Sequence, residues 1–225
     1  MLKTRIEWCD YSWSPVIGCS GKCPYCYARK MAHRFHRDFT PHFVEKNFNR
    51  HFPRHPSRIF VNSMSDVSEW KIDWILPVKD RMWEHPEHRF IILTKHSERI
   101  YRDWPSNVLV GASVTDQESY MAESFQVADG TVNFLSIEPM LGPIDMEEMT
   151  CGQTLRWIIV GAETGNRKGK VVPEPEWIDD IYEYATDNDI PLFFKESLKP
   201  YWPFDGYDYF PKEYPAWREK ENGNS

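Results

Sequence analysis

Three cysteines lie within eight residues near the N-terminus, at Cys19, Cys23 and Cys26, in the spacing CxxxCxxC. The chain holds five cysteines in all, so this clustering stands out from the background. Thiolates are the ligands that iron–sulfur clusters use. Three of them can hold three irons of a [4Fe–4S] cube and leave the fourth iron open to another molecule. The spacing therefore predicts a redox enzyme in which these cysteines are metal ligands at the catalytic centre.

A zinc site is the alternative for the same cysteines. A fourth ligand such as His33 or His36 would complete a tetrahedral Zn²⁺ site. The spacing matches no common zinc module, and zinc gives no reason for the aromatic Tyr25 directly before the last cysteine. Gly18 and Gly21 relax the backbone around the cysteines, so that it can wrap a cube. The loop therefore favours a cluster over zinc.

The other two cysteines, Cys9 and Cys151, are isolated, and we expect each to be a small buried residue rather than a ligand. The odd number of cysteines and the crowding of three of them argue against disulfides. The N-terminal residues MLKTRIEWCDYSW contain no apolar signal core, and no run of eighteen apolar residues occurs. We therefore expect a cytoplasmic protein without a membrane span.

The composition fits one globular domain of 225 residues, 41% hydrophobic and 15% aromatic. The formal net charge of −7 differs from that of a generic nucleic-acid binder, which is normally basic. Basic residues nevertheless gather between residues 29 and 58. That segment suits a phosphate-bearing substrate, and a solvated surface is the alternative interpretation.

Short apolar runs alternate with helix-length segments along the chain. Within each run the apolar residues are consecutive and do not alternate with polar ones, which is typical of parallel strands buried on both faces. This order predicts a parallel α/β sheet. The expected strands are residues 58–62, 89–93, 107–111, 132–137, 155–161 and 190–194, with an extended stretch at 7–17. The expected helices are residues 28–37, 74–84 with Asp73 as N-cap, 97–103, 116–128 and 176–188.

Polar residues follow nearly every expected strand, which favours a barrel, because the carboxyl ends of all barrel strands face one mouth. About six strands predict an incomplete (β/α)6 TIM-like barrel over residues 1–198. Residues 199–225 are expected to form a tail that wraps the surface. The polar residues at the strand ends are Ser63, Ser65, Asp66, Lys95, Ser113, Thr115, Glu138, Glu163 and Lys195.

The cysteine loop resembles that of the radical S-adenosylmethionine (SAM) superfamily, because Cys19, Cys23, Tyr25 and Cys26 match its CxxxCx(aromatic)C pattern. The resemblance implies that the amino and carboxylate groups of SAM chelate the open iron. It implies that the reduced cluster cleaves SAM to a 5′-deoxyadenosyl radical, which abstracts hydrogen from a substrate. It also implies a partial (β/α)6 barrel with the cysteine loop after the first strand, and a reducing partner such as flavodoxin or ferredoxin.

A closer resemblance to the phage Gp37/Gp68 family, also called DUF5131, covers most of the chain. It is carried by the segments IEWCDYSWSPVIGC, IFVNSMSD, ILTK, VGASV, LSIEPMLGPI, WIIVGAETG and PLFFK. The chain departs from that pattern at Cys9, where a Thr-like residue is expected, and in FFKES, which replaces an FFKQ-type ending. If the chain is phage-encoded, the expected location is the host cytoplasm.

The resemblance to the superfamily suggests a role for each polar residue of the barrel mouth. Tyr25 would present backbone groups near the adenine of SAM. The run that contains Ser63, Ser65 and Asp66 would bind the methionine amino group through charge-assisted hydrogen bonds. Ser113 and Thr115 would contact the ribose through their hydroxyls. The carboxylates of Glu138 and Glu163 would bind SAM or substrate, and Lys95 and Lys195 would bind substrate groups.

The sequence leaves three functions open. The first is a radical SAM enzyme acting on a modified nucleotide or DNA base, as in phage nucleic-acid hypermodification, with an isomerase, lyase or transferase outcome. The second is a radical SAM enzyme acting on a small metabolite or peptide. The third is a non-catalytic interaction protein with a structural zinc site. The first is favoured, with a [4Fe–4S] cluster and SAM as cofactors.

Overall fold

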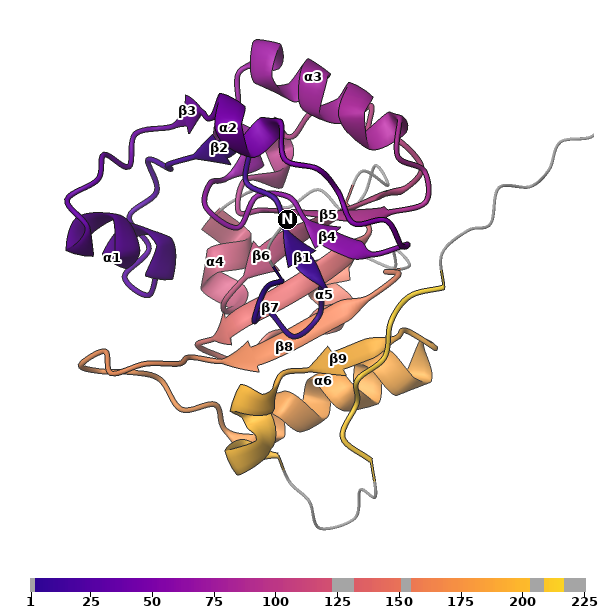
Figure 1. The fold of residues 1–225 in the computed structure, drawn as a ribbon. Helices are drawn as coiled ribbons and strands as arrows, with labels where there is room; N and C mark the ends of the chain where they lie inside the picture. Colours follow the sequence, from indigo (N-terminus) through magenta and orange to yellow (C-terminus); the bar gives the residue numbers. More distant parts are fainter. Residues whose placement is uncertain (1–2, 123–131, 151–154, 203–208, 217–225) are drawn as a thin grey trace, which may run out of the picture.

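The centre of the computed structural model, which describes residues 3–122, 132–150, 155–202 and 209–216, is a seven-stranded sheet (Figure 1). All its strand pairs are parallel. The sheet is curled into a half-barrel, which confirms the predicted partial TIM-like fold. In spatial order the strands are β1 (Tyr11–Ser12), β4 (Arg58–Phe60), β5 (Arg89–Thr94), β6 (Val108–Val114), β7 (Phe134–Met140), β8 (Ile158–Ala162) and β9 (Leu192–Phe194).

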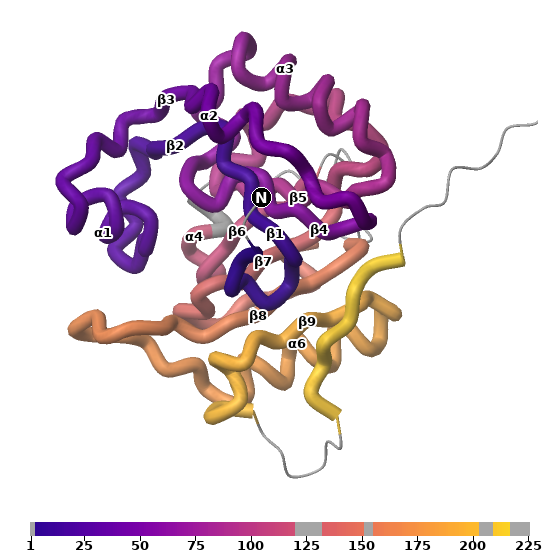
Figure 2. The backbone as a smooth tube through the Cα atoms, viewed as in Figure 1, coloured from indigo at the N-terminus to yellow at the C-terminus, as the bar shows by residue number. Residues whose placement is uncertain are grey.

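A separate antiparallel pair, β2 (Val16–Ile17) with β3 (His42–Phe43), brackets the segment that carries the cysteines. The cysteine loop therefore follows the first strand of the barrel, as predicted. Within this segment, α1 (Tyr27–Arg34) packs the buried Ala28 and Ala32 against Phe39. Figures 1 and 2 show α1 at one side of the molecule, away from the sheet.

The long helices lie close to their predicted positions. α3 (Ile72–Trp83) and α6 (Pro175–Asp187) cover the sheet, and the short helices are α2 (Glu45–Phe48), α4 (Gln117–Ala122) and α5 (Met146–Thr150). The sequence did not predict α2 or α5. The part of the expected helix 116–128 beyond Ala122 lies outside the described residues.

Two helix predictions are wrong. Asp73 is not the N-cap of α3, because Lys71 holds that position and Asp73 lies in the first turn. A carboxylate there still stabilises the helix through the macrodipole. The helix expected at 97–103 is only a 3₁₀ turn, η2 (Ser97–Arg99), and the backbone is extended again at Ile100. The N-cap residue of this turn, His96, makes no side-chain capping hydrogen bond, so the contact that commonly stabilises the start of a helix is missing.

The core has a distinct layer inside the half-barrel. Phe60, Ile91, Leu109, Phe134 and Ile159 are buried there, one from each of five neighbouring strands. Phe60, Ile91 and Leu109 are register partners across β4, β5 and β6, and the ring of Phe134 lies over Gly111 of β6, where no side chain blocks it. Separate clusters lie under α3 and under α5 and α6.

Segments from both ends of the chain pack against the interior layer. Trp8 meets Phe60 at a ring-centroid distance of 4.8 Å and Trp157 at 6.2 Å. From the other end, Tyr214 lies 5.8 Å from the Trp157 ring. Since β1 and β9 are the two edges of the sheet, these aromatic residues occupy the space that further strands fill in a closed barrel.

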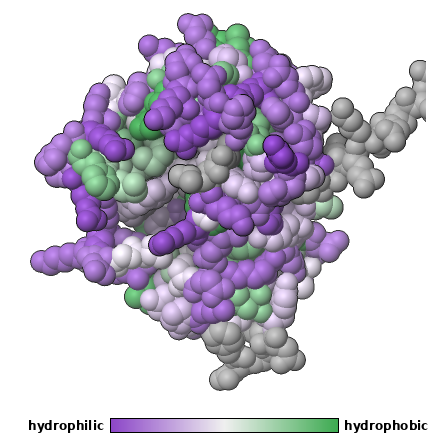
Figure 3. All heavy atoms as spheres, viewed as in Figure 1, coloured by the Kyte–Doolittle hydropathy of each residue, from purple (hydrophilic) through white to green (hydrophobic). Residues whose placement is uncertain are grey.

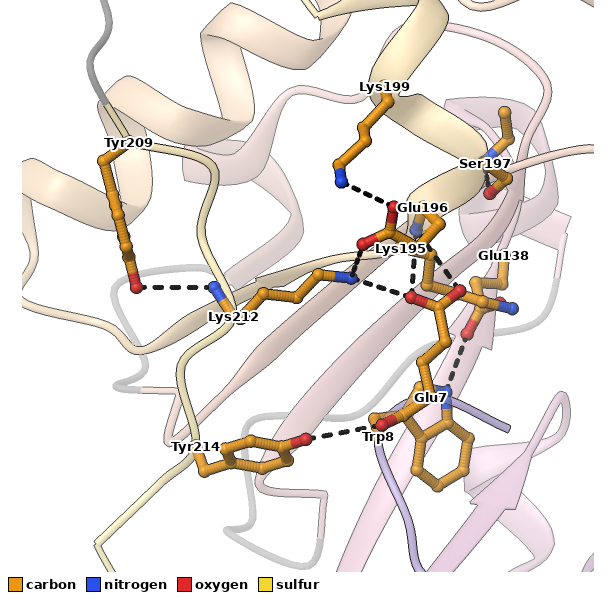
Figure 4. A network of polar contacts seen from close by, with 11 residues as sticks. Glu7, Trp8, Glu138, Lys195, Glu196, Ser197, Lys199, Tyr209, Lys212 and Tyr214 are labelled. Carbon is orange, nitrogen blue, oxygen red and sulfur yellow. Dashed lines mark hydrogen bonds and ion pairs between the residues drawn. The ribbon is translucent and has the colours of Figure 1, made fainter. Parts of the chain in front are cut away.

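Polar contacts hold the C-terminal segment in place (Figure 4). Lys212 donates to the Glu7 carboxylate at 2.7 Å and pairs with Glu196 at 3.1 Å. Trp157 donates to the Glu213 carbonyl at 3.0 Å. The described part of the predicted tail therefore wraps the β9 edge. Among the described residues, no helix has the length and apolar character that crossing a membrane requires.

Candidate functional site

A cavity of about 330 Å³ opens at the carboxyl ends of the strands. This volume is within the usual range for small-molecule sites. The structure brings all the predicted site residues except Thr115 to its wall. These are Cys19, Cys23, Tyr25, Cys26, Ser63, Ser65, Asp66, Lys95, Ser113, Glu138, Glu163 and Lys195.

Gly18 sets the course of the cysteine loop. Its φ of +102° lies in the left-handed region that favours glycine. A Cβ at this position would lie 2.4 Å from the backbone of Thr40. The Gly18 amide donates to the Met64 carbonyl at 3.0 Å, and the Cys19 amide donates to the Phe39 carbonyl at 3.0 Å. The loop is therefore held between the segment after β4 and the segment before β3.

Two side chains that the sequence did not identify also hold the loop. The Arg29 guanidinium donates to the carbonyls of Cys19 and Gly21. Glu69, in the 3₁₀ turn η1 (Val67–Glu69), accepts from the amide of Ser20 at 2.9 Å and from its hydroxyl at 3.0 Å. No local motif marks Glu69, because its partner lies 49 positions away in sequence.

The thiols sit in different local environments. Cys26 is the N-cap of α1, and its sulfur accepts from the Arg29 amide at 3.4 Å. Burial raises the pKa of Cys19 to about 12, and the nearby Glu69 carboxylate acts in the same direction. A thiol with a raised pKa would lose its proton to solvent when it coordinates a metal, because a coordinated thiol is deprotonated.

The donor set suits a cluster better than a single ion. Cys19, Cys23 and Cys26 are all described, yet their sulfurs do not all lie within 4.8 Å of one another. Ligand sulfurs around one tetrahedral zinc lie about 3.8 Å apart, given a Zn–S bond of about 2.3 Å. Neither His33 nor His36 completes a ligand set with the cysteines among the described residues. Three thiols on separate corners of a cube are spaced more widely, so these residues fit a [4Fe–4S] cluster.

Tyr25 connects the loop to the strands. The Lys95 ammonium lies 5.3 Å from the centroid of its ring and donates to the Ser113 hydroxyl at 3.1 Å. Burial raises the pKa of Tyr25. Ser113 belongs to β6 rather than to the loop after it, because this strand extends to Val114.

Asp66 has a structural role. It is buried, and its carboxylate accepts from the Thr94 hydroxyl at 2.6 Å, the Lys95 amide at 2.9 Å and the Ser68 amide at 3.0 Å. These bonds cap η1 and fix the segment after β4 to the end of β5. Ser65 accepts from the Trp70 indole at 3.0 Å, so protein donors already engage both predicted acceptors for the SAM amino group.

Glu138 and Lys195, which both line the cavity, form an ion pair; Figure 4 shows the two side chains near Trp8. Glu138 also accepts from the Trp8 indole at 3.1 Å and from Ser136 at 3.3 Å. Burial lowers the pKa of Lys195, but the charge and hydrogen bond of Glu138 outweigh it and hold that pKa above its usual value. The lysine is therefore a fixed cation at the cavity wall.

The last two predicted residues differ in position. Glu163 accepts two hydrogen bonds from the Arg167 guanidinium, at 2.6 and 2.7 Å, which hold the pKa of this carboxyl below its usual value. Thr115 does not line the cavity. Its hydroxyl donates to Asp116 and Ser119 at 3.2 Å, so it helps to form the turn before α4.

The basic segment 29–58 divides into internal and exposed residues. Arg29 binds the cysteine loop, and Arg58 pairs with Asp10 at 3.0 Å, so both stabilise the fold. The side chains of Tyr27 and Met31 on α1 and of Phe35 at its C-cap are 52%, 46% and 55% exposed, and the Tyr27 hydroxyl also donates to the Ser63 carbonyl at the cavity wall at 2.6 Å. Hydrophobic atoms accordingly show on the α1 side of the molecule among hydrophilic ones (Figure 3).

Comparisons with known proteins agree with this geometry. The family described as "Protein of unknown function (DUF5131)" matches residues 3–200. A solved structure of a mutant of spore photoproduct lyase is similar, with a TM-score of 0.52 at 12% sequence identity. The similarity covers 85% of this chain and 80% of that one. At this identity it supports the fold. No curated protein matches the sequence.

Proposed function

We propose that this chain, which belongs to the DUF5131 family, is a radical SAM enzyme that binds one [4Fe–4S] cluster through Cys19, Cys23 and Cys26. One observation carries the proposal. The three thiols of a CxxxCxxC loop line the same cavity as a set of polar strand-end side chains, at the carboxyl ends of a parallel half-barrel. The similarity of fold to a radical SAM enzyme supports it.

The cofactors would carry the difficult chemistry, and the protein would supply binding and orientation. When bound, the cluster and SAM would together supply a 5′-deoxyadenosyl radical that removes hydrogen from the substrate. Glu69 and Arg29 would hold the cysteine loop in position. Tyr25 and Ser113 would bind the nucleoside part of SAM, and Lys95 would bind a carboxylate.

Ser63 is the strand-end hydroxyl best placed to bind the SAM amino group. Among the side chains described, it shares hydrogen bonds only with the hydroxyls of Ser12 at 2.6 Å and Ser14 at 3.0 Å. A hydroxyl can rotate to accept from an ammonium. Asp66 would act by fixing the backbone around Ser63 and Ser65.

The substrate end of the cavity would lie at Trp8, Glu138 and Lys195. We propose a modified nucleotide or an accessible DNA base as substrate, because α1 presents exposed aromatic and basic side chains beside the cavity. Arg34 and Arg37 lie 5.9 and 5.5 Å from the centroid of the Phe35 ring, and such a surface can stack bases and bind phosphates.

A small metabolite or a peptide is the alternative substrate. The same basic face would receive an acidic reducing partner such as flavodoxin or ferredoxin.

Anaerobic reconstitution tests the proposal. The wild-type chain should become brown, absorb near ~400 nm and hold about four irons per chain. Cys23→Ala should lose most of the iron, and Cys9→Ala should keep it, because Cys9 is buried with its sulfur 4.0 Å from the Ile6 carbonyl. A wild-type protein that stays colourless and takes up one zinc through the three cysteines would contradict the cluster.

A further inference from the structure

The turn that precedes β5 carries a second group of metal-binding side chains, at the end of the half-barrel away from the cavity. Among the described residues, His85, Glu87 and His88 offer ligand atoms that all lie within 4.8 Å of one another. The sequence HPEH places them between the end of α3 and the start of β5. None of the three lines the cavity that holds the cysteines.

His88 is an unusual core residue. Its side chain is 0% exposed, and neither ring nitrogen makes a hydrogen bond of normal geometry among the described residues, although the backbone of Pro53 is close enough to interact with the ring. The nearest carboxylate oxygen, Glu87 Oε1, lies 3.5 Å from Nε2. A buried polar group without a partner costs about 1–3 kcal/mol. Packing alone therefore does not explain why an imidazole occupies this position.

The backbone of the turn is fixed before any ligand binds. The His88 amide donates to the His85 carbonyl at 3.1 Å. The side-chain NH2 group of the buried Asn107 donates to the backbone carbonyls of Met82, His85 and His88, at 3.0, 3.1 and 3.4 Å. The ring of Phe52 packs edge-on against both imidazoles, at centroid distances of 4.8 and 5.6 Å. Such support is what a metal site requires of its surroundings.

The two other side chains have room to close on an ion. Those of His85 and Glu87 are 36% and 44% exposed, and His85 Nδ1 already lies 3.1 Å from Glu87 Oε1. Ligand nitrogens around a tetrahedral zinc lie about 3.3 Å apart, given Zn–N bonds of about 2.0–2.1 Å. Small rotations of the two half-exposed side chains toward the fixed His88 would reach that spacing.

We propose that His85, Glu87 and His88 bind a divalent transition-metal ion of the zinc class, with solvent in the remaining position. Two imidazoles and one carboxylate are a donor set that zinc accepts. The ion would link the end of α3 to the start of β5 and would satisfy the ring nitrogen of His88. Its role would be structural, because the amino ends of barrel strands serve stability rather than catalysis.

Zinc binding to the full-length chain, measured by equilibrium dialysis, tests this site against a matched control. His85 is half-exposed, so His85→Ala should fold, and His42→Ala removes an exposed histidine of β3 instead. Wild type and His42→Ala should bind one zinc more than His85→Ala, and zinc should raise the melting temperature of the first two proteins by more than that of His85→Ala. Any zinc held by the cysteine loop contributes equally to all three proteins. Equal zinc content in the three proteins would overturn the proposal.

Cobalt(II) provides a second, spectroscopic readout of the same site. Measured as a difference from the cobalt-free protein, the cobalt that binds at the proposed site should add visible d–d bands without an intense near-ultraviolet band of thiolate coordination. Glu87→Gln should weaken cobalt binding by about 10-fold or more. A cobalt spectrum that His85→Ala and Glu87→Gln leave unchanged would contradict the assignment. Because the site contains no cysteine, either result is independent of whether the loop binds iron.

Discussion

At the scale of single residues, the pair Lys195–Glu138 is the polar contact that most affects the character of the cavity. It places one positive and one negative group on the wall beside Trp8. The two side chains are 23% and 20% exposed, so solvent screens the pair only in part. Breaking such a pair leaves a poorly solvated charge, whereas removing both charges costs much less.

We therefore predict that Lys195→Met lowers the free energy of unfolding by about 1–3 kcal/mol, since Glu138 then loses its charged partner. The double variant Lys195→Met with Glu138→Gln should recover part of that loss. Urea unfolding of the two single variants and the double variant measures the coupling. Additive losses would show that the pair does not couple.

The pH dependence of this difference follows from the raised pKa of Lys195. A group whose folded pKa is raised contributes stability that is fully present below its unfolded pKa and is lost as the pH rises through the folded pKa. The difference in the free energy of unfolding between wild type and Lys195→Met should therefore stay constant from about pH 6 to about pH 9, because this range lies below the usual lysine pKa of about 10.4.

At the scale of elements, the cysteine loop depends on the backbone that surrounds it. Gly18 joins the loop to the segment after β4 through an isolated bridge to Ser65. It also passes so close to Thr40 that only a hydrogen fits in place of a side chain. The loop, β3 and the segment after β4 thus form one unit, and a change at Gly18 must move the cysteines.

Gly18→Ala should therefore lose most of its capacity to hold iron, measured as iron per chain after reconstitution. Gly169→Ala is the matched control, because Gly169 has a similar φ of +73° but no atom within 4 Å of the place that an added methyl group would take. The control incurs only the cost of the left-handed conformation, about 1–2 kcal/mol, and should keep its iron. Full iron in Gly18→Ala would show that the loop does not depend on this close approach.

At the scale of the whole molecule, the two ends of the chain complete the half-barrel. Trp8 from one end and Tyr214 from the other pack on Trp157. Glu7 and Lys212 join the two ends by an ion pair. The open side of the sheet is therefore covered by side chains, and the cavity is left at the carboxyl ends of the strands.

Local sequence patterns are sufficient to predict the strands of the sheet and most of the cavity wall. Continuous apolar runs locate the six strands β4 to β9, and polar residues at their ends locate the cavity wall. Such patterns fail where long-range packing decides. Glu69 and Arg29 are identified only once the loop is folded against them. β6 continues to Val114, past the apolar run 107–111 that marks it in the sequence, so Thr115 lies in the turn that follows the strand. The composition of segment 97–103 suggests a helix, but the turn there lacks a side-chain cap and the backbone becomes extended at Ile100.

The most direct test of the central claim is the formation of 5′-deoxyadenosine by the reconstituted protein, after anaerobic reduction with dithionite in the presence of SAM. We predict that wild type and Cys9→Ala form it and that Cys23→Ala does not. A wild-type protein that holds about four irons per chain yet forms no 5′-deoxyadenosine under these conditions would contradict the assignment as a radical SAM enzyme.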